Sequence, residues 1–159
     1  MRHEVTNQSP PLEDVNAFAL DPLLKEAVVR EGAGHAVTTL DAWGAWCGSA
    51  EALELARSAN VDTPRLRTHD AKGRRLDQVE FHPAYHALMA RSVEAGLHGL
   101  AASHLLPGAV KRAGAHVERA AAFYMTAGLE SGHCCPITMT NAAASALTGF
   151  GERLSHHFS

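Results

Sequence analysis

Residues 115–147, AHVERAAAFYMTAGLESGHCCPITMTNAAASAL, decide the fold class of this chain. Two runs rich in Ala and other small residues are separated by the stretch from Gly132 to Pro136. Because small side chains let helices approach closely, we expect a tightly packed pair, one helix from about Ala115 to Glu130 and one beginning at Pro136. The second run carries Thr138, Thr140 and Asn141 among apolar neighbours. Polar groups on a buried helix need partners in the protein or in a ligand.

The remaining sequence predicts further helices and one hairpin. Capping residues and apolar spacing favour helices that begin at Asp21-Pro22, Ala36, Ser49 and His82-Pro83, the last reaching about Leu106. Between them, residues 65–69 and 76–81 alternate in twos around the turn at 70–73, which is typical of a β-hairpin. We therefore predict a mainly α fold, a helical bundle with one small β-hairpin.

Composition limits the class of protein. The 159 residues fit one domain, and 46% hydrophobic with 19% charged residues is ordinary for a globular protein. A net charge of −3 gives no global field for nucleic acid or an anionic membrane. Three cysteines, no secretory signal and no apolar run of the roughly 18 residues that a membrane span needs favour a reduced, cytoplasmic protein.

Few residue patterns indicate chemistry. His82 and His86 are spaced to face one metal from a helix, and His133-Cys134-Cys135 suggests zinc or a reactive thiolate, but capping and packing explain both more simply. The hydroxyls of Thr138 and Thr140 can bond back to carbonyl groups of their own helix or face a ligand cleft. No nucleophile–base pair, carboxylate dyad or phosphate loop stands out, so these patterns alone leave the function open.

Taken together, the segments resemble one known family. The order and spacing of Glu26 to Gly34, Ser49 to Asn60, Phe81 to His86, Gly114 to Tyr124 and Cys135 to Thr140 resemble the AidB-like adaptive-response flavoproteins of the acyl-CoA dehydrogenase superfamily. The resemblance runs from about Val5 to Leu147. It implies that residues 1–147 form the amino-terminal helical domain, followed by a divergent tail at 148–159.

The resemblance also carries expectations about cofactor and partners. In this family a middle β-domain and a C-terminal bundle follow, FAD binds mainly between them, the proteins form tetramers, and acyl thioesters are oxidised. The resemblance places the family's DNA binding in the C-terminal part. We therefore expect a truncated chain that binds no FAD, has no dehydrogenase activity and binds no DNA by itself. Thr138 and Thr140 are the expected cleft-lining residues, and no catalytic, cofactor-binding or metal residue is assigned.

Two other classes compete with this interpretation. A helical module could have kept the fold and bind itself or a partner protein, since the faces that other domains cover in the family would be exposed apolar patches. A small metal protein using His82, His86, His133 and the cysteines is the least favoured hypothesis.

Overall fold

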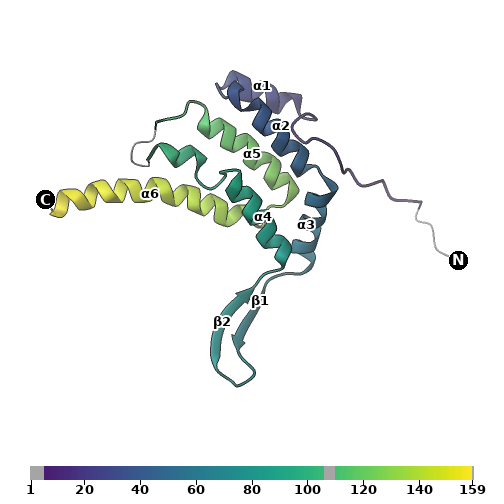
Figure 1. The fold of residues 1–159 in the computed structure, drawn as a ribbon, viewed down its shortest axis with the longest axis vertical. Helices are drawn as coiled ribbons and strands as arrows, with labels where there is room; N and C mark the ends of the chain where they lie inside the picture. Colours follow the sequence, from purple (N-terminus) through teal and green to yellow (C-terminus); the bar gives the residue numbers. More distant parts are fainter. Residues whose placement is uncertain (1–5, 106–109, 159) are drawn as a thin grey trace.

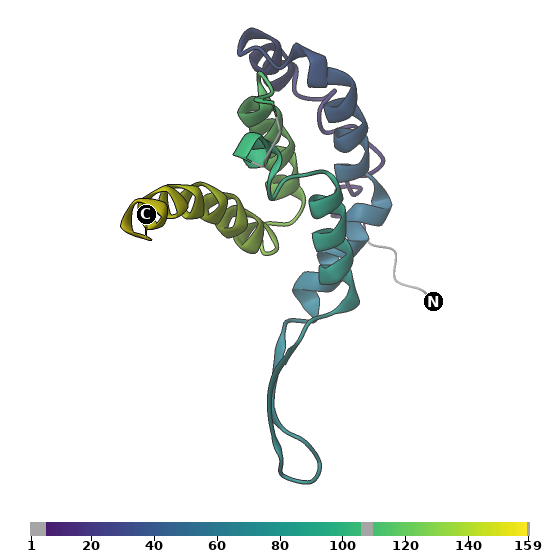
Figure 2. The same ribbon diagram turned by 60° about the vertical axis from the view of Figure 1, so that its left-hand side comes forward.

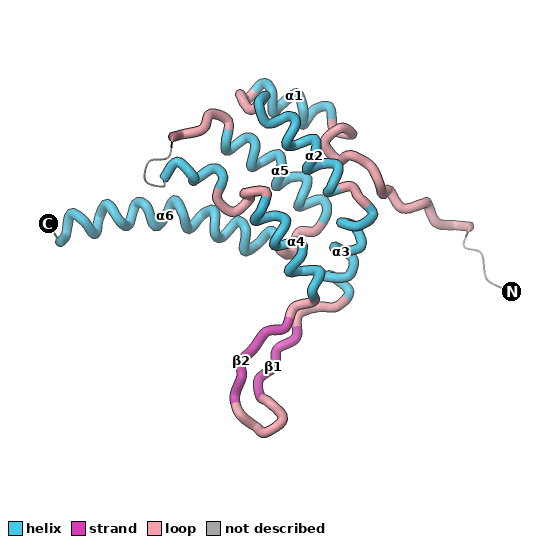
Figure 3. The backbone as a smooth tube through the Cα atoms, in the orientation of Figure 1, coloured by secondary structure: helices cyan, strands magenta, loops and turns pink. Residues whose placement is uncertain are grey.

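The computed structural model describes residues 6–105 and 110–158, with backbone alone for residues 104, 105, 145 and 148–158. Six α-helices, two 3₁₀ turns and one antiparallel hairpin account for its regular structure (Figures 1 and 3). In chain order the elements are α1 (Pro22–Arg30), η1 (Gly34–Ala36), α2 (Val37–Cys47), α3 (Ala50–Val61), β1 (Arg65–His69), β2 (Arg75–Glu80), α4 (Pro83–Glu94), η2 (Leu100–Leu105), α5 (Ala115–Leu129) and α6 (Cys134–Phe158). The predicted fold class is confirmed.

Helices α2 and α5 form the centre of the body. Helix α1 packs on both of them, and α3 and α4 lie side by side at one end (Figure 1). The caps expected from sequence are present: Oδ1 of Asp21 accepts a hydrogen bond from Leu24 N at 2.9 Å, and Oγ of Ser49 accepts one from Ala52 N at 3.1 Å. These side chains begin α1 and α3 because each satisfies a backbone donor that the helix leaves free.

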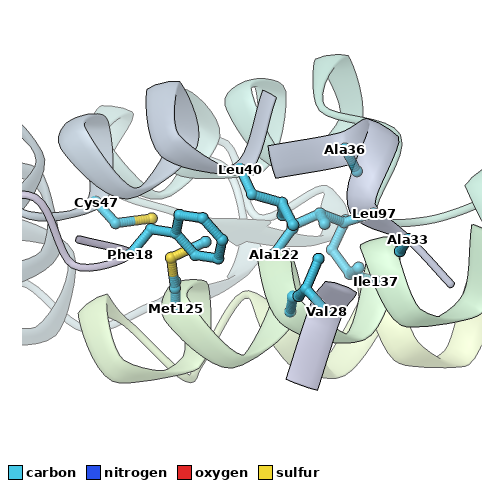
Figure 4. Close-up of a cluster of buried hydrophobic side chains, with 11 residues drawn as sticks. Phe18, Val28, Ala33, Ala36, Leu40, Cys47, Leu97, Ala122, Met125 and Ile137 are labelled. Atoms are coloured by element: carbon cyan, nitrogen blue, oxygen red, sulfur yellow. The ribbon is translucent and has the colours of Figure 1, made fainter. Parts of the chain in front are cut away.

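The core lies between α1, α2, α5 and the start of α6, and most of its side chains are small. Figure 4 shows the aromatic ring of Phe18 between Cys47 and Met125, with Leu40, Leu97 and Ile137 farther along. The buried apolar cluster comprises Phe18, Val28, Ala33, Ala36, Leu40, Cys47, Leu97, Ala121, Ala122, Met125 and Ile137. The alanines on α5 keep α2 and α5 close together, as the sequence predicts.

Phe18 reaches this core because the N-terminal arm lies directly on α2. The backbone N–H of Ala17 donates to the carbonyl of Gly44 at 3.0 Å, and Val15 donates to Gly48 at 3.2 Å. A Cβ at Gly44 would lie 2.5 Å from the backbone nitrogen of Phe18. Glycine at this position therefore permits the contact between arm and helix.

The expectation of one long helix from His82 to about Leu106 is wrong, although Leu106 itself lies outside the described residues. Helix α4 ends at Glu94, and the separate 3₁₀ turn η2 covers Leu100–Leu105. Gly96 interrupts it with a φ of +76°, a conformation that glycine adopts at low cost. Leu97 N then donates to Ser92 O at 3.1 Å, which closes the end of α4. Because of this break, the side chain of Leu97 packs in the core, where it is buried.

The hairpin projects from the junction of α3 and α4 (Figure 2), and all of its strand residues are exposed. Arg67 pairs with Gln78 whereas His69 pairs with Arg75, so β2 has one extra residue, and Asp77 has a φ of +49°. This bulge places Leu76 on the face that already carries the paired Leu66 and Val79. One face of the hairpin is therefore apolar and uncovered.

Helix α6 begins at Cys134, two residues before the expected Pro136, and packs mainly on η2 and α5 (Figure 2). The expectation that its polar residues are buried is wrong for Thr138 and Thr140, which are exposed, whereas Asn141 is half-buried and its buried Oδ1 has no hydrogen-bond partner among the described residues. The side of α6 that faces the body carries the buried Ile137 in the first turn and the half-buried Asn141 and Ala144 farther along. The helix runs through Leu147 without a break, and the boundary at that residue stays a prediction. Within residues 6–105 and 110–158, no helix is both long and apolar enough to cross a bilayer.

Candidate functional site

The exposed side of α6 carries an apolar stripe that two hydroxyl groups border. Side chains at helical spacing that face away from the body form what we name the α6 stripe: Met139, Ala142, Ala143, Ala146 and Leu147. Met139 is 65% exposed and Leu147 is 68% exposed. Successive side chains of an α-helix are rotated by about 100° around its axis. Thr138 and Thr140 precede and follow Met139 by one residue, so they lie at opposite borders of the stripe.

The two threonines differ in the hydrogen bonds that they can offer. Oγ1 of Thr140 donates to the carbonyl of Pro136 at 2.9 Å, the bond back along the helix that the sequence left open. Its hydroxyl can therefore only accept a bond from a ligand. Thr138 has no hydrogen-bond partner among residues 6–105 and 110–158, so its hydroxyl can donate and accept. Thr138 is the better placed of the two to contact a ligand.

The orientation of α6 is set by a buried polar network at its first turn. Glu130 follows the end of α5, and its carboxylate accepts hydrogen bonds from the backbone N–H groups of Gly132 at 2.6 Å and His133 at 2.9 Å. Nδ1 of His133 donates to Oε2 of Glu130 at 2.6 Å. On the other side of the ring, Nε2 lies 2.8 Å from Oγ of Ser92 on α4. The network thus ties the start of α6 to both α5 and α4.

Serine, histidine and carboxylate occur here in the order that a nucleophilic triad uses, but the geometry supports a structural role. Ser92 and His133 both have 0% exposure, so a substrate cannot reach the hydroxyl. Burial by itself would raise the pKa of Glu130, yet the hydrogen bonds from His133 and Gly132 lower it below its ordinary value. The carboxylate therefore stays charged and serves as the cap of α6.

The cysteines are poorly suited to nucleophilic or metal chemistry. Burial raises the pKa of Cys47 to about 12 and that of Cys134 to about 11. Cys135 is exposed. In the part of the chain that the structure describes, no three His, Cys, Asp or Glu side chains gather as a metal site. His82 instead caps α4, since its Nδ1 accepts from Ala84 N at 3.2 Å.

Glu130 is the residue of this region that the sequence did not single out. The position of His133 beside two cysteines suggests zinc or thiolate chemistry, but its ring contacts a carboxylate three residues earlier and a serine on another helix. The available signal was the spacing of Glu130 before Gly132 and His133, where a carboxylate can reach the free N–H groups of a helix start. Ser92 had no local signal, because its contact with His133 depends on tertiary packing.

Comparison with known proteins gives consistent results. The family model described as "Adaptive response protein AidB N-terminal domain" matches residues 7–158. The chain is 48% identical over 145 residues to the Escherichia coli K12 protein named "Putative acyl-CoA dehydrogenase AidB", covering 91% of this chain and 26% of that protein. The chain therefore spans about a quarter of the length of this relative.

Solved structures share the fold at lower identity. ACDH-11 of Caenorhabditis elegans, in complex with C11-CoA, superposes with a TM-score of 0.78 at 21% identity, covering 95% of this chain and 26% of that one. The apo form of Bd2924 superposes with a TM-score of 0.76 at 22% identity, covering 89% of this chain and 28% of that one. At such identities these matches establish the fold.

Proposed function

The chain belongs to the AidB N-terminal domain family, and we propose that it supplies a helical wall of the ligand cleft in an AidB-like acyl-CoA dehydrogenase, without dehydrogenase activity of its own. The observation that carries this proposal is the α6 stripe. A helix that packs on the body along one side, with an uncovered apolar face bordered by hydroxyls on the other, is suited to packing against another domain.

The proposed role of α6 toward a flavin is limited to bordering it. Thr138 can donate or accept one hydrogen bond and Thr140 can accept one. Residues 138–147 contain no Lys or Arg, so this face offers no cation to the pyrophosphate of FAD. The residues thus fit the apolar or ring portion of a bound group, and phosphate contacts would come from domains outside this chain. When bound, FAD would accept the hydride in the family's reaction.

This proposal is tested with the chain alone and in a chimera. The purified chain should be colourless and should not reduce an artificial electron acceptor with acyl-CoA above a buffer control. A chimera in which residues 7–158 replace the matching segment of the E. coli protein should retain FAD. A correctly folded chimera without FAD, or turnover by the chain alone, would overturn the proposal.

The position of Thr138 is tested within that chimera. Thr138→Val keeps the side-chain shape and removes the hydroxyl, so we expect weaker retention of FAD or a higher KM for acyl-CoA. Thr38→Val is the matched control, because Thr38 is an exposed threonine on a helix, α2, away from the α6 stripe. Equal FAD content and KM in the two variants would remove Thr138 from the cleft.

A second candidate function is self-association or partner binding without catalysis. The uncovered hairpin face of Leu66, Leu76 and Val79 favours it, because a two-stranded hairpin alone is only marginally stable in water. Under this alternative the purified chain forms oligomers whose mass rises with concentration in light scattering. A strict monomer at all concentrations would contradict the alternative.

Two further expectations complete the proposal. The free cysteines are consistent with a reducing, cytoplasmic compartment. The net charge of −3 is unfavourable for contact with the phosphates of duplex DNA, so the chain alone should not shift a DNA duplex in a gel.

A further inference from the structure

A pocket separate from α6 opens between α2, α4, η2 and α5. Its volume is about 320 Å³, within the range of small-molecule sites. The walls are mainly apolar, formed by the indole rings of Trp43 and Trp46 and by Leu40, Leu97 and Leu100. None of the residues of the α6 stripe lines it.

The indole rings present their hydrocarbon surfaces to this pocket. Nε1 of Trp43 donates to the carbonyl of Ala122 at 3.2 Å and to Oγ1 of Thr126 at 3.1 Å, so its polar edge is already occupied within the protein. The two ring centroids lie 4.6 Å apart at an interplanar angle of 32°. This contact holds both rings in place and leaves an apolar wall formed before any ligand arrives.

Arg119 is the polar group of the pocket whose charge is uncompensated. Its Nε donates to the carbonyl of Leu97 at 2.6 Å, and the guanidinium lies 5.1 Å from the ring centre of Phe123. Its Nη2 is buried with no hydrogen-bond partner, and no carboxylate pairs with Arg119 in the part of the chain that the structure describes. Burial lowers the pKa of this guanidinium, which reflects the cost of a buried cation.

The two carboxylates beside the pocket are engaged elsewhere. Glu118 is buried and pairs with Arg112 at 2.9 Å and with His35 at 3.5 Å. Glu94 is exposed and lies 3.7 Å from Arg91, whose guanidinium rests over the ring of Trp46 at 5.2 Å. Among the charged residues that line the pocket, Arg119 is therefore the cation with no carboxylate partner among the described residues.

We propose that this pocket binds a small apolar carboxylate, with its hydrocarbon part against the indole rings and leucines and its carboxylate on the guanidinium of Arg119. A monoanion matches the single positive charge of this guanidinium, whereas a phosphate is usually held by several cationic or N–H donors. Two kinds of hydrocarbon meet this description, an aliphatic chain and an aromatic ring. The site is independent of the role proposed for α6, since none of its lining residues belongs to that helix.

Intrinsic fluorescence reports directly on this site, because the two tryptophans of the chain both line the pocket. Octanoate and 3-phenylpropionate should change the emission saturably. Octanol, which has the chain length of octanoate and no charge, should bind about tenfold more weakly, as expected for the loss of one charge-assisted hydrogen bond. The tighter of the two acids identifies the kind of hydrocarbon.

Three variants separate the proposed site from nonspecific binding. Arg119→Gln should abolish the preference for octanoate over octanol, while Arg57→Gln, an exposed arginine on α3, should leave it unchanged. Ala42→Phe places a ring at the exposed edge of the pocket and should remove saturable binding of all the probes without touching Arg119. Because Ala42 is exposed, this variant should fold even if Arg119→Gln does not. Equal affinity for octanoate and octanol, or wild-type octanoate binding in folded Ala42→Phe, would overturn the proposal.

Discussion

Nδ1 of His133 lies 2.6 Å from Oε2 of Glu130, and both side chains are almost fully buried where α5 ends and α6 begins. The same carboxylate accepts the first free N–H groups of α6. Since the imidazole also contacts Ser92 on α4, three helices meet at this pair. The direction in which α6 leaves the body, and with it the exposure of the α6 stripe, depends on this contact.

Replacing Glu130 by Gln should therefore destabilise the chain by about 2 kcal/mol, because hydrogen bonds to a charged group contribute about 1.5–3 kcal/mol. The substitution keeps the shape but removes the charge and places an N–H₂ group where acceptors are needed. Urea unfolding followed by circular dichroism measures the change. Glu26→Gln is the control, since Glu26 forms an exposed contact with Arg30 at 3.4 Å, for which about 0–0.5 kcal/mol is expected. Equal stability of the two variants would exclude Glu130 as an important cap.

The same pair predicts how stability depends on pH. The folded pKa of Glu130 lies below its ordinary value of 4.5, so its contribution is complete above about pH 4.5 and is lost as pH falls through the lower folded value. The wild type should lose stability more steeply than Glu130→Gln across this window. Urea midpoints at a series of acidic pH values test the difference, and parallel curves would show that Glu130 titrates as it does in the unfolded chain.

Local sequence signals predicted most helix starts because the responsible side chains act within a few residues. Asp21, Ser49 and His82 each accept a backbone N–H two or three residues ahead, which needs no tertiary contact. The alternation of polar and apolar residues and the turn between the two strands also predicted the hairpin. The end of α4 was missed because the apolar spacing continues past Gly96, and glycine within such a pattern does not by itself establish a break.

The candidate site was less predictable. Small residues on α5 and α6 gave the same sequence signal, yet α5 is central and the α6 stripe is exposed. Composition cannot distinguish a helix that packs inside its own domain from one whose partner lies elsewhere in a longer protein. Arg119 gave no signal either, because its unpartnered Nη2 follows from the packing of η2 and α5 around it. The family resemblance did identify the fold, and its implication that Thr138 and Thr140 line a cleft stays a prediction.

The contact between the N-terminal arm and α2 predicts opposite effects for two glycine substitutions. Gly44→Ala would bring a Cβ to 2.6 Å from Cβ of Phe18, so the arm must shift. We expect a net loss of about 1–2 kcal/mol, since overpacking costs about 1–3 kcal/mol while alanine gains up to about 1 kcal/mol in helix propensity. Gly128→Ala on α5 meets no atom within 4 Å and should be neutral or stabilising by up to about 1 kcal/mol. Thermal unfolding compares them, and a stabilising Gly44→Ala would contradict the close contact.

The three cysteines should differ sharply in reactivity, because a thiolate is the attacking species and needs access to the reagent. Cys135 is exposed, whereas Cys47 and Cys134 are buried, and burial raises their pKa values to about 12 and about 11. At neutral pH the native chain should release one equivalent quickly from an aromatic disulfide reagent and the other two only after denaturant is added. Cys135→Ser should lose the fast equivalent and keep the slow ones.

Two fast equivalents in the native wild type would mean that the start of α6 opens readily, because Cys134 lies in its first turn and its thiol contacts the carbonyl of Glu130 at 3.5 Å. Repeating the assay in Glu130→Gln then links reactivity to the cap, since weakening the anchor of α6 should accelerate the reaction of Cys134 and leave Cys47 slow.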